Sequence, residues 1–287
     1  MNKTYDLTVI YVVYAIATYV AFQTGLYYSE HVSVPIIRQK FNLPTTMAME
    51  IGFVADCGAT LVIFIFSIIY NNSSMYDAYC KYILYGLFYP LENLHRLIVI
   101  STNKLLYIFI GSVAPQILSC FWIAEQGFPQ YDSINSGVYI RKWIVMAIMF
   151  LWSNRLTYNW ARSWTGFNHE DWRYVEVFQK DTKNKFQYWV ESFAGIHFFP
   201  TAIVFFALIP AYYILHDLDR VYVANNSLNV YDLIGCFVGF GAVLLQGTAD
   251  NQLYHFRQTN KVKGKVLSTG VWSCCRHPNY GGEILHW

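Results

Sequence analysis

Residues 51–70 read IGFVADCGATLVIFIFSIIY, an apolar run in which Asp56 is the only charged residue. A helix needs about 20 mostly apolar residues to cross the hydrocarbon layer of a membrane. The run meets that length, so it predicts a membrane-spanning helix. A carboxylate inside such a helix is energetically expensive, which makes Asp56 a candidate functional residue.

Similar apolar runs recur along the chain. Residues 79–100 are ambiguous because charged side chains interrupt them, and they fit either a broken or re-entrant helix or a helix at the membrane interface. The sequence therefore predicts six or seven transmembrane helices. The further expected spans are residues 7–28, 105–124, 138–154, 194–215 and 231–249.

The composition excludes most other classes of protein. Of the 287 residues, 55% are apolar and 13% are charged, whereas a soluble domain carries about 25% charged residues. The net charge of +2 does not indicate a nucleic-acid partner. The six cysteines show no metal-binding or redox spacing, so we expect no disulfide framework and no metal site. The predicted fold class is an all-α polytopic membrane protein.

The distribution of basic residues predicts an orientation. Lysine and arginine gather in residues 155–191 and again in 250–282, whereas residues 216–230 contain only Arg220. Two predicted spans separate the basic segments, so both lie on one side of the membrane. Cytoplasmic loops carry the excess of Lys and Arg, and we therefore expect both segments to face the cytosol.

The motifs of soluble nucleotide enzymes and hydrolases are absent. The chain contains no GxGxxG after a strand and no GxxxxGK[ST], HExxH or GxSxG. This excludes soluble Rossmann dehydrogenases, P-loop ATPases, zinc proteases and serine hydrolases. Any cofactor must bind through another architecture.

Two polar clusters lie at the expected cytosolic ends of helices. In the first, Arg155, Asn159 and Arg162 fall at i, i+4 and i+7, so they share one helical face that suits phosphate oxygens. The alternative is a row of arginines that reach the lipid headgroups. In the second, Asp250 and Arg257 also share a face. A carboxylate suits ribose hydroxyls or an amide and an arginine suits a pyrophosphate, but a polar stripe at the membrane edge is the favoured interpretation of this cluster taken alone.

The third cluster is the densest. Residues 269–283 read TGVWSCCRHPNYGGE and place a guanidinium, an imidazole, an amide, a phenol and a carboxylate within eight residues. Pro278 fixes its own φ, and Gly281 and Gly282 allow the backbone to approach a ligand closely. A surface turn rarely needs so many different hydrogen-bonding groups, so this segment predicts a ligand site.

These strings resemble a known family. RHPNYxGE at residues 276–283, preceded by GVW, is similar to the signature of the steroid 5-alpha-reductase C-terminal superfamily, and in particular to its branch of predicted reductases. That branch also shows WSxRLTxNWxRxW, found here at 152–164, HEDWRY at 169–174, and ADxQ followed by FR within 249–257. The resemblance covers residues 138–287 and divides the chain into amino-terminal helices, 1–137, and a reductase-like domain.

The resemblance implies an all-helical membrane fold, in the endoplasmic reticulum, whose cytosolic mouth binds NADPH. A hydride would pass to a carbon–carbon double bond of a steroid or other lipid held between the helices. By carry-over, with Asn159 and Arg162 added from the first cluster, the cofactor-binding residues are Asp250, Arg257, Arg276, His277, Asn279, Tyr280 and Glu283.

Two other hypotheses fit the function of this sequence. The same superfamily contains isoprenylcysteine carboxyl methyltransferases, which use a similar string to bind S-adenosylmethionine. A membrane scaffold or lipid-binding protein without turnover is the third reading. In addition, the family continues through at least one more helix, whereas this chain stops at Trp287, four residues after Glu283. We therefore expect the final helix of the family to be missing.

The catalytic acid is expected in the amino-terminal helices. Hydride addition to an enone needs a group that polarises the carbonyl as negative charge develops on its oxygen. The resemblance implies a carboxylate and a tyrosine in these helices, and Asp56 is the natural candidate, with Tyr85, Tyr89 and Glu92 as weaker ones. The alternative for Asp56 is a structural hydrogen bond between helices.

Overall fold

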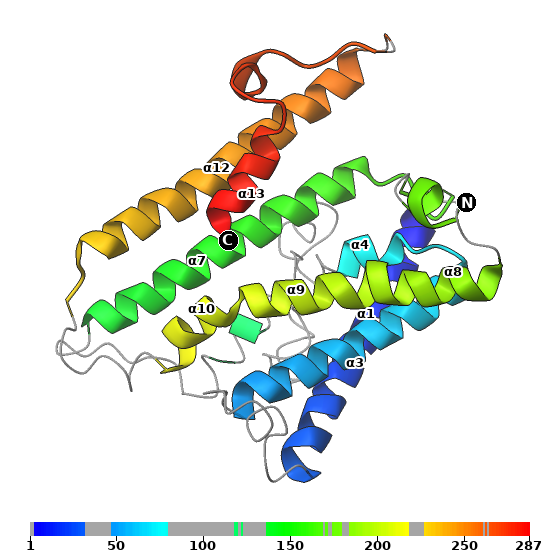
Figure 1. Cartoon of the computed structure of the whole chain (residues 1–287), viewed down its shortest axis with the longest axis horizontal. Helices are drawn as coiled ribbons and strands as arrows, with labels where there is room; N and C mark the ends of the chain where they lie inside the picture. The colour runs from blue at the N-terminus through cyan, green and yellow to red at the C-terminus, as the bar shows by residue number, and fades with distance from the viewer. Residues whose placement is uncertain are drawn as a thin grey trace.

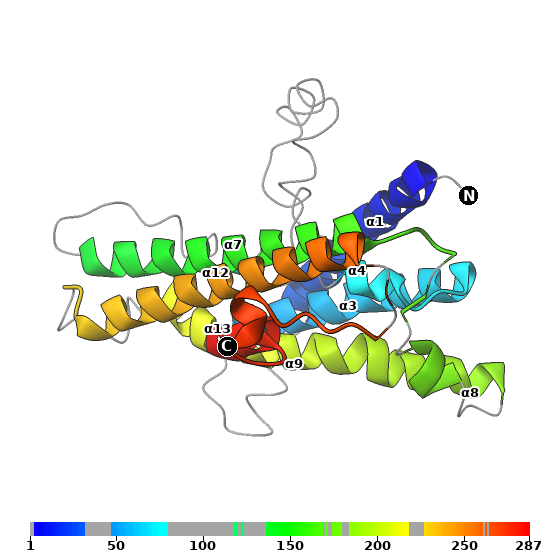
Figure 2. The ribbon, with the colours of Figure 1, turned by 90° about the horizontal axis from the view of Figure 1, so that it is seen from above.

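The computed structural model of this chain describes residues 3–31, 47–79, 118–119, 122, 136–168, 170–171, 174–179, 184–217, 227–260, 262 and 264–287. Within these ranges the regular structure is helical, with no strand. The long helices lie alongside one another, as Figures 1 and 2 show. The predicted all-α fold is confirmed.

Four helical stretches of the described residues are long and apolar enough to cross a membrane. They lie in α1 (Lys3–His31), α3 (Met47–Tyr70), Lys185–Ala207 and α12 (Val230–Thr259). The predicted polytopic membrane protein is thus confirmed, and three predicted spans match closely. The span predicted at 194–215 begins earlier, at Lys185. The helices predicted at 79–100 and 105–124 lie almost entirely outside the described residues, so the total of six or seven stays a prediction.

The long segment after Lys185 is a helix that prolines and π-turns interrupt. It comprises α8 (Lys185–Glu191), π-helical η2 (Ser192–Phe198), α9 (Phe199–Ala207), α10 (Ile209–Tyr212) and π-helical η3 (Tyr213–Asp217). Pro200 and Pro210 stand in the first turns of α9 and α10, where a missing N–H disrupts the helix least. The segment therefore continues in one direction, antiparallel to its neighbours (Figure 1).

The amino-terminal helices form a compact group with η2 and α9. Gly25 and Gly58 allow α1 and α3 to approach closely, since a Cβ on Gly58 would lie 2.9 Å from Thr24 Oγ1. The opposite face of α3 meets η2 and α9 through hydrogen bonds between Thr60 and Thr201 (2.9 Å) and between Ser67 and His197 (3.1 Å). These bonds fix the register of helices whose apolar surfaces alone would slide.

α7 (Ser136–Ser163) extends beyond the span predicted at 138–154, and its charged residues keep it outside the four most apolar stretches. It runs parallel to α12, because Arg141 near its start binds Asp232 (2.7 Å) and Arg162 near its end binds Asn251 (2.6 Å). Figures 1 and 2 show the two helices side by side. The basic segments that follow α7 and α12 therefore lie at the same end, as predicted.

Short elements complete the described structure. α4 (Met75–Tyr79) follows the turn after α3, and residues 164–168 and 170–171 lie against that turn. The Glu170 carboxylate accepts the Ser73 N–H (2.8 Å), and the Asp171 N–H donates to Ser74 Oγ (2.8 Å). η1 (Tyr174–Gln179), the 3₁₀ turn η4 (Gly270–Ser273) and α13 (Pro278–His286) follow. The loop thus fastens the carboxyl end of α7 to the amino-terminal helices.

Candidate functional site

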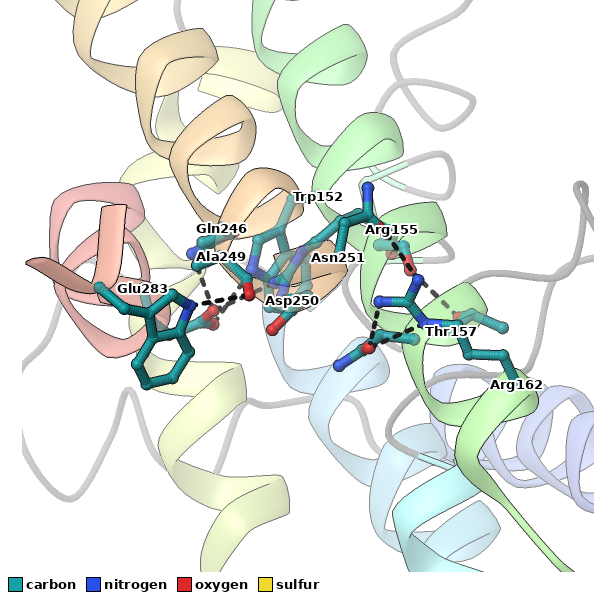
Figure 3. Close-up of polar contacts among 12 residues, drawn as sticks. Trp152, Arg155, Thr157, Arg162, Gln246, Ala249, Asp250, Asn251 and Glu283 are labelled. Atoms are coloured by element: carbon teal, nitrogen blue, oxygen red, sulfur yellow. Dashed lines mark hydrogen bonds and ion pairs between the residues drawn. The ribbon is translucent and has the colours of Figure 1, made fainter. Parts of the chain in front are cut away.

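The three polar clusters of the sequence meet where α13 packs across α12 beside α7, in the carboxyl-terminal halves of these two long helices. α7 and α12 bring residues 152–162 and 246–257 next to each other, and α13 packs across α12, with the carboxylate of Glu283 turned toward both (Figure 3). Arg155 is at the centre. Its guanidinium donates to Asp250 Oδ2 (2.7 Å) and to Glu283 Oε2 (3.3 Å).

The Glu283 carboxylate has both oxygens occupied. Oε2 accepts from Arg155 and from Gln246 Nε2 (2.9 Å), while Oε1 accepts the indole N–H groups of Trp152 (3.0 Å) and Trp287 (3.1 Å). Asp250 is buried, with 5% of its surface exposed. We call Arg155, Asp250, Glu283, Gln246 and Trp152 the Arg155 network. It joins α7, α12 and α13 through charge-assisted hydrogen bonds, which are stronger than neutral ones.

The segment before α13 is attached to the same face of α12. The Val271 N–H donates to Gln252 Oε1 (3.1 Å), and the Trp272 indole donates to the Ala249 carbonyl (3.1 Å). Gly270 has φ +63°, in the left-handed region that favours glycine, and a Cβ there would lie within 2.4 Å of the Gln252 side chain. Residues 276–280 lead into the first turn of α13, and we call them the 276–280 turn. They are attached to α12 on both sides, before the turn through Trp272 and after it through Glu283.

Gly282 and Gly281 have different roles. A Cβ on Gly282 would come 2.5 Å from Gln246 Cγ and 3.0 Å from the Ala242 carbonyl oxygen, whereas a Cβ on Gly281 would meet nothing within 4 Å. In this structure Gly282 thus lets α13 approach α12, and not a ligand as the sequence suggested.

This difference gives a matched pair of substitutions. We expect Gly282→Ala to lower the free energy of unfolding by about 1–3 kcal/mol, because the new methyl group forces α13 away from α12. Gly281→Ala removes a glycine from the same helix without a clash and should be neutral or stabilising by about 0.4–1 kcal/mol. Thermal unfolding in detergent compares the two variants. Equal effects would contradict the close contact at Gly282.

Arg162 is fixed without a carboxylate partner among the described residues. Its Nη1 donates to Asn251 Oδ1 (2.6 Å), its Nη2 to Asn159 Oδ1 (2.8 Å), and its guanidinium carbon lies 4.4 Å from the centre of the Tyr254 ring. Two amides and an aromatic face orient the cation but do not neutralise it. Such a group is prepared to bind an anion.

An open groove of about 470 Å³ lies beside these residues, between α12 and residues 267–269. Beyond it, Arg257 and Arg276 are exposed, and neither forms an ion pair with any residue that the structure describes. Asn279 Oδ1 is buried without a hydrogen-bond donor, while the His277 ring stacks on Tyr280 at 5.2 Å. The groove lining consists of Thr248, Asn251, Gln252, His255, Phe256, Thr259, Leu267 and Thr269.

The residues predicted from sequence thus divide into three sets. Asp250 and Glu283 are bound to Arg155. Arg162 is a cation held in place by Asn159. The remaining groups are exposed or lack a hydrogen-bond partner: Arg257, Arg276, His277, Asn279 and Tyr280. Asp56, with 7% of its surface exposed, is on α3, one turn from Thr60 on the face toward α9. It is not part of the Arg155 network.

Sequence reasoning missed the residues that hold the site together. Gln246 and Gln252 are buried or half-buried on α12 and bind Glu283 and Val271. Gln246 precedes Asp250 by one helical turn, as Trp152 precedes Arg155 by three residues. The sequence does contain a signal for these residues. A polar or indole side chain one turn before a charged residue lies on the same helix face and can therefore bind the same partner. Glu170 and Asp171 of the HEDWRY string serve the turn after α3, while His169, Trp172 and Arg173 lie outside the described residues.

His286 has a perturbed pKa beside this network. Its ring stacks on Trp152 at 4.9 Å, and both ring nitrogens are buried without a hydrogen-bond partner. Burial and then the positive charge of Arg155 lower the pKa of His286 from 6.5 to about 4. The folded protein therefore resists protonation of this ring.

The protein should lose stability in acid for this reason. The unfolded chain binds the proton at its ordinary pKa near 6.5 and the folded chain only near 4, so stability is complete above the first value and falls as the pH decreases toward the second. The loss amounts to about 3 kcal/mol. Thermal unfolding as a function of pH measures it, and His286→Phe, which keeps the stacking, should remove that part of the pH dependence. An unchanged profile in the variant would disprove the assignment.

Comparison with known proteins gives one family. The family model described as a protein of unknown function (DUF1295) matches residues 109–287, which is more than half of the chain. No curated protein and no solved structure matches the sequence. All three clusters that form the site fall within the matched residues. The chain therefore belongs to the DUF1295 family, which is related to steroid 5-alpha-reductase-like proteins.

Proposed function

We propose that this protein is a membrane-embedded reductase that transfers a hydride from NADPH to a carbon–carbon double bond of a steroid or other lipid. The observation that carries the proposal is the meeting of three polar clusters that are distant in sequence, next to an open groove lined by α12 and residues 267–269, in a chain of the DUF1295 family. The RHPNYxGE string that resembles the reductase signature lies in this assembly. We further propose that the end of the bundle at which α7 and α12 finish faces the cytosol, in the endoplasmic reticulum membrane.

The available groups fit a dinucleotide. Asn279 Oδ1 is a buried acceptor without a donor, which suits the amide of a nicotinamide or a ribose hydroxyl. Arg162, Arg257 and Arg276 are cations without a carboxylate partner among the described residues, which suits the phosphates. Lys265 is exposed nearby in sequence and suits a 2′-phosphate. NADPH supplies the hydride when bound, and these residues hold and orient it.

Asp56 is the proposed acid of the reaction. It is a buried carboxylate in a membrane-spanning helix, and an ionisable residue at such a position is a functional candidate by default. A protonated carboxyl group polarises the carbonyl of an enone by donating a hydrogen bond to its oxygen, where negative charge develops. The lipid would then lie between the helices, with its double bond between Asp56 and the cofactor.

Ligand-dependent stability tests the proposal. A ligand that binds only the folded state raises stability by about 2.7 kcal/mol at a hundredfold excess over its Kd. We expect thermal unfolding in detergent to shift with NADPH, less with NADH, and not with S-adenosylmethionine. Arg276→Ala should remove the shift, whereas Arg141→Ala, at the opposite end of α7, should retain it.

Other results of this thermal-shift experiment would point to other functions. A shift with S-adenosylmethionine alone would replace the reductase by a methyltransferase of the isoprenylcysteine type. An NADPH shift that persists in Arg276→Ala would remove the 276–280 turn from the site. The absence of a shift with all three ligands would favour a non-catalytic membrane scaffold.

A further inference from the structure

The 276–280 turn carries the free groups of the site, but its position depends on residues outside it. Arg276, His277 and Tyr280 are exposed, and the turn is attached to α12 before it, through Trp272, and after it, through Glu283. The first attachment uses neutral hydrogen bonds only. The second includes the only cation that contacts Glu283 among the described residues, Arg155.

Arg155 is the cation that connects α7, α12 and α13. It extends from α7, binds Asp250 on α12 and Glu283 on α13, and has only 13% of its side chain exposed. Both oxygens of Glu283 already have donors, and Asp250 is almost fully buried. The Glu283 carboxylate therefore offers a ligand no oxygen that lacks a donor, and Asp250 Oδ2 is bound to Arg155.

We infer that Arg155 is a positioning residue for the 276–280 turn, that it acts through Glu283 and Asp250, and that the Glu283 carboxylate does not contact the ligand. This inference rests on the proposed dinucleotide site. It also changes the role of Glu283, which the family resemblance assigned to cofactor contact.

The chain contains a matched control. Arg141 also joins α7 to α12, through Asp232, with 14% and 18% of the two side chains exposed. It lies at the other end of the helices and does not touch α13. Arg141→Met therefore removes a similar ion pair between the same two helices without affecting the turn.

Hydrogen exchange of the ligand-free protein in detergent tests the positioning role. Arg155→Met and Glu283→Gln should both accelerate amide exchange in residues 277–286 at least severalfold, with no change in α1 and α3, because exchange reports local opening. Arg141→Met should leave exchange in 277–286 unchanged. Exchange that rises equally everywhere, or as much in Arg141→Met, would overturn the inference. Should Arg155→Met fail to fold, Arg155→Lys, which reaches one carboxylate, takes its place with a smaller change.

NADPH affinity then tests whether Glu283 touches the ligand. Arg155→Met and Glu283→Gln should each raise the Kd by about tenfold, and the double variant should be no weaker than either single variant, since the two act through one contact. If the double variant instead raises the Kd by the product of the two single effects, Glu283 binds the ligand itself and the inference is overturned. If the parent protein does not bind NADPH, the proposed function fails, while the exchange comparison still decides the role of Arg155.

Discussion

Asp56→Asn is expected to reduce turnover of an enone lipid by about 10²- to 10⁴-fold, the usual contribution of a positioned general acid. Asparagine keeps the volume and a hydrogen-bonding amide but has no acidic proton. NADPH binding should remain, because Asp56 lies on α3 and the cofactor groups lie on α7, α12 and α13. Parallel measurements of turnover and of the NADPH-induced thermal shift separate these two effects.

Glu50→Gln is the control for this variant. Glu50 is a second buried acid on α3, with 2% of its surface exposed, and it accepts a hydrogen bond from the Tyr28 hydroxyl at 3.0 Å. Glu50→Gln also replaces a buried carboxyl group of α3 by an amide, but Glu50 has no proposed role in the reaction. If Asp56→Asn retains turnover, or loses no more than Glu50→Gln, Asp56 is a structural residue that bonds between helices.

Arg155→Met should lower the free energy of unfolding by about 3–5 kcal/mol, because it leaves Asp250 and Glu283 partly or fully buried without their cation. Denaturant or thermal unfolding in detergent measures the change. Arg155→Met combined with Glu283→Gln should recover part of the loss, since one uncompensated charge is removed. A loss below about 1 kcal/mol in the single variant would mean that solvent reaches the Arg155 network as it reaches surface ion pairs.

The fold was predictable where the physical signal lies within one continuous stretch of sequence. The apolar runs at 7–28, 51–70 and 231–249 required membrane helices regardless of their neighbours, because hydrocarbon leaves no other partner for the backbone. The basic segments likewise indicated that α7 and α12 end on the same side. The long helix after Lys185 was placed too late, since Lys185, Gln187 and Glu191 lower the hydropathy of a stretch that still forms a helix.

The site was predictable as a location and less so as a set of roles. Local density of polar groups indicated the 276–283 string, and helical spacing indicated Arg155, Asn159 and Arg162. Which carboxylate faces a ligand and which binds an arginine depends on contacts between residues 95 and 128 positions apart. Spacing along one helix cannot show these contacts, and therefore Asp250 and Arg257 were paired by sequence although only Arg257 is exposed. Gly282 was assigned to ligand approach for the same reason.

The parallel arrangement of α7 and α12 has a consequence for biosynthesis. Arg155 leaves the ribosome 95 residues before Asp250 and 128 residues before Glu283, and synthesis adds about 5–20 residues per second. The arginine therefore waits roughly 5–20 s for its first carboxylate, while the intervening chain crosses the bilayer and returns. The contacts that Arg155 makes with α12 and then with α13 form only once those helices have been synthesised. The ligand site is thus assembled only after all the described membrane helices are in place.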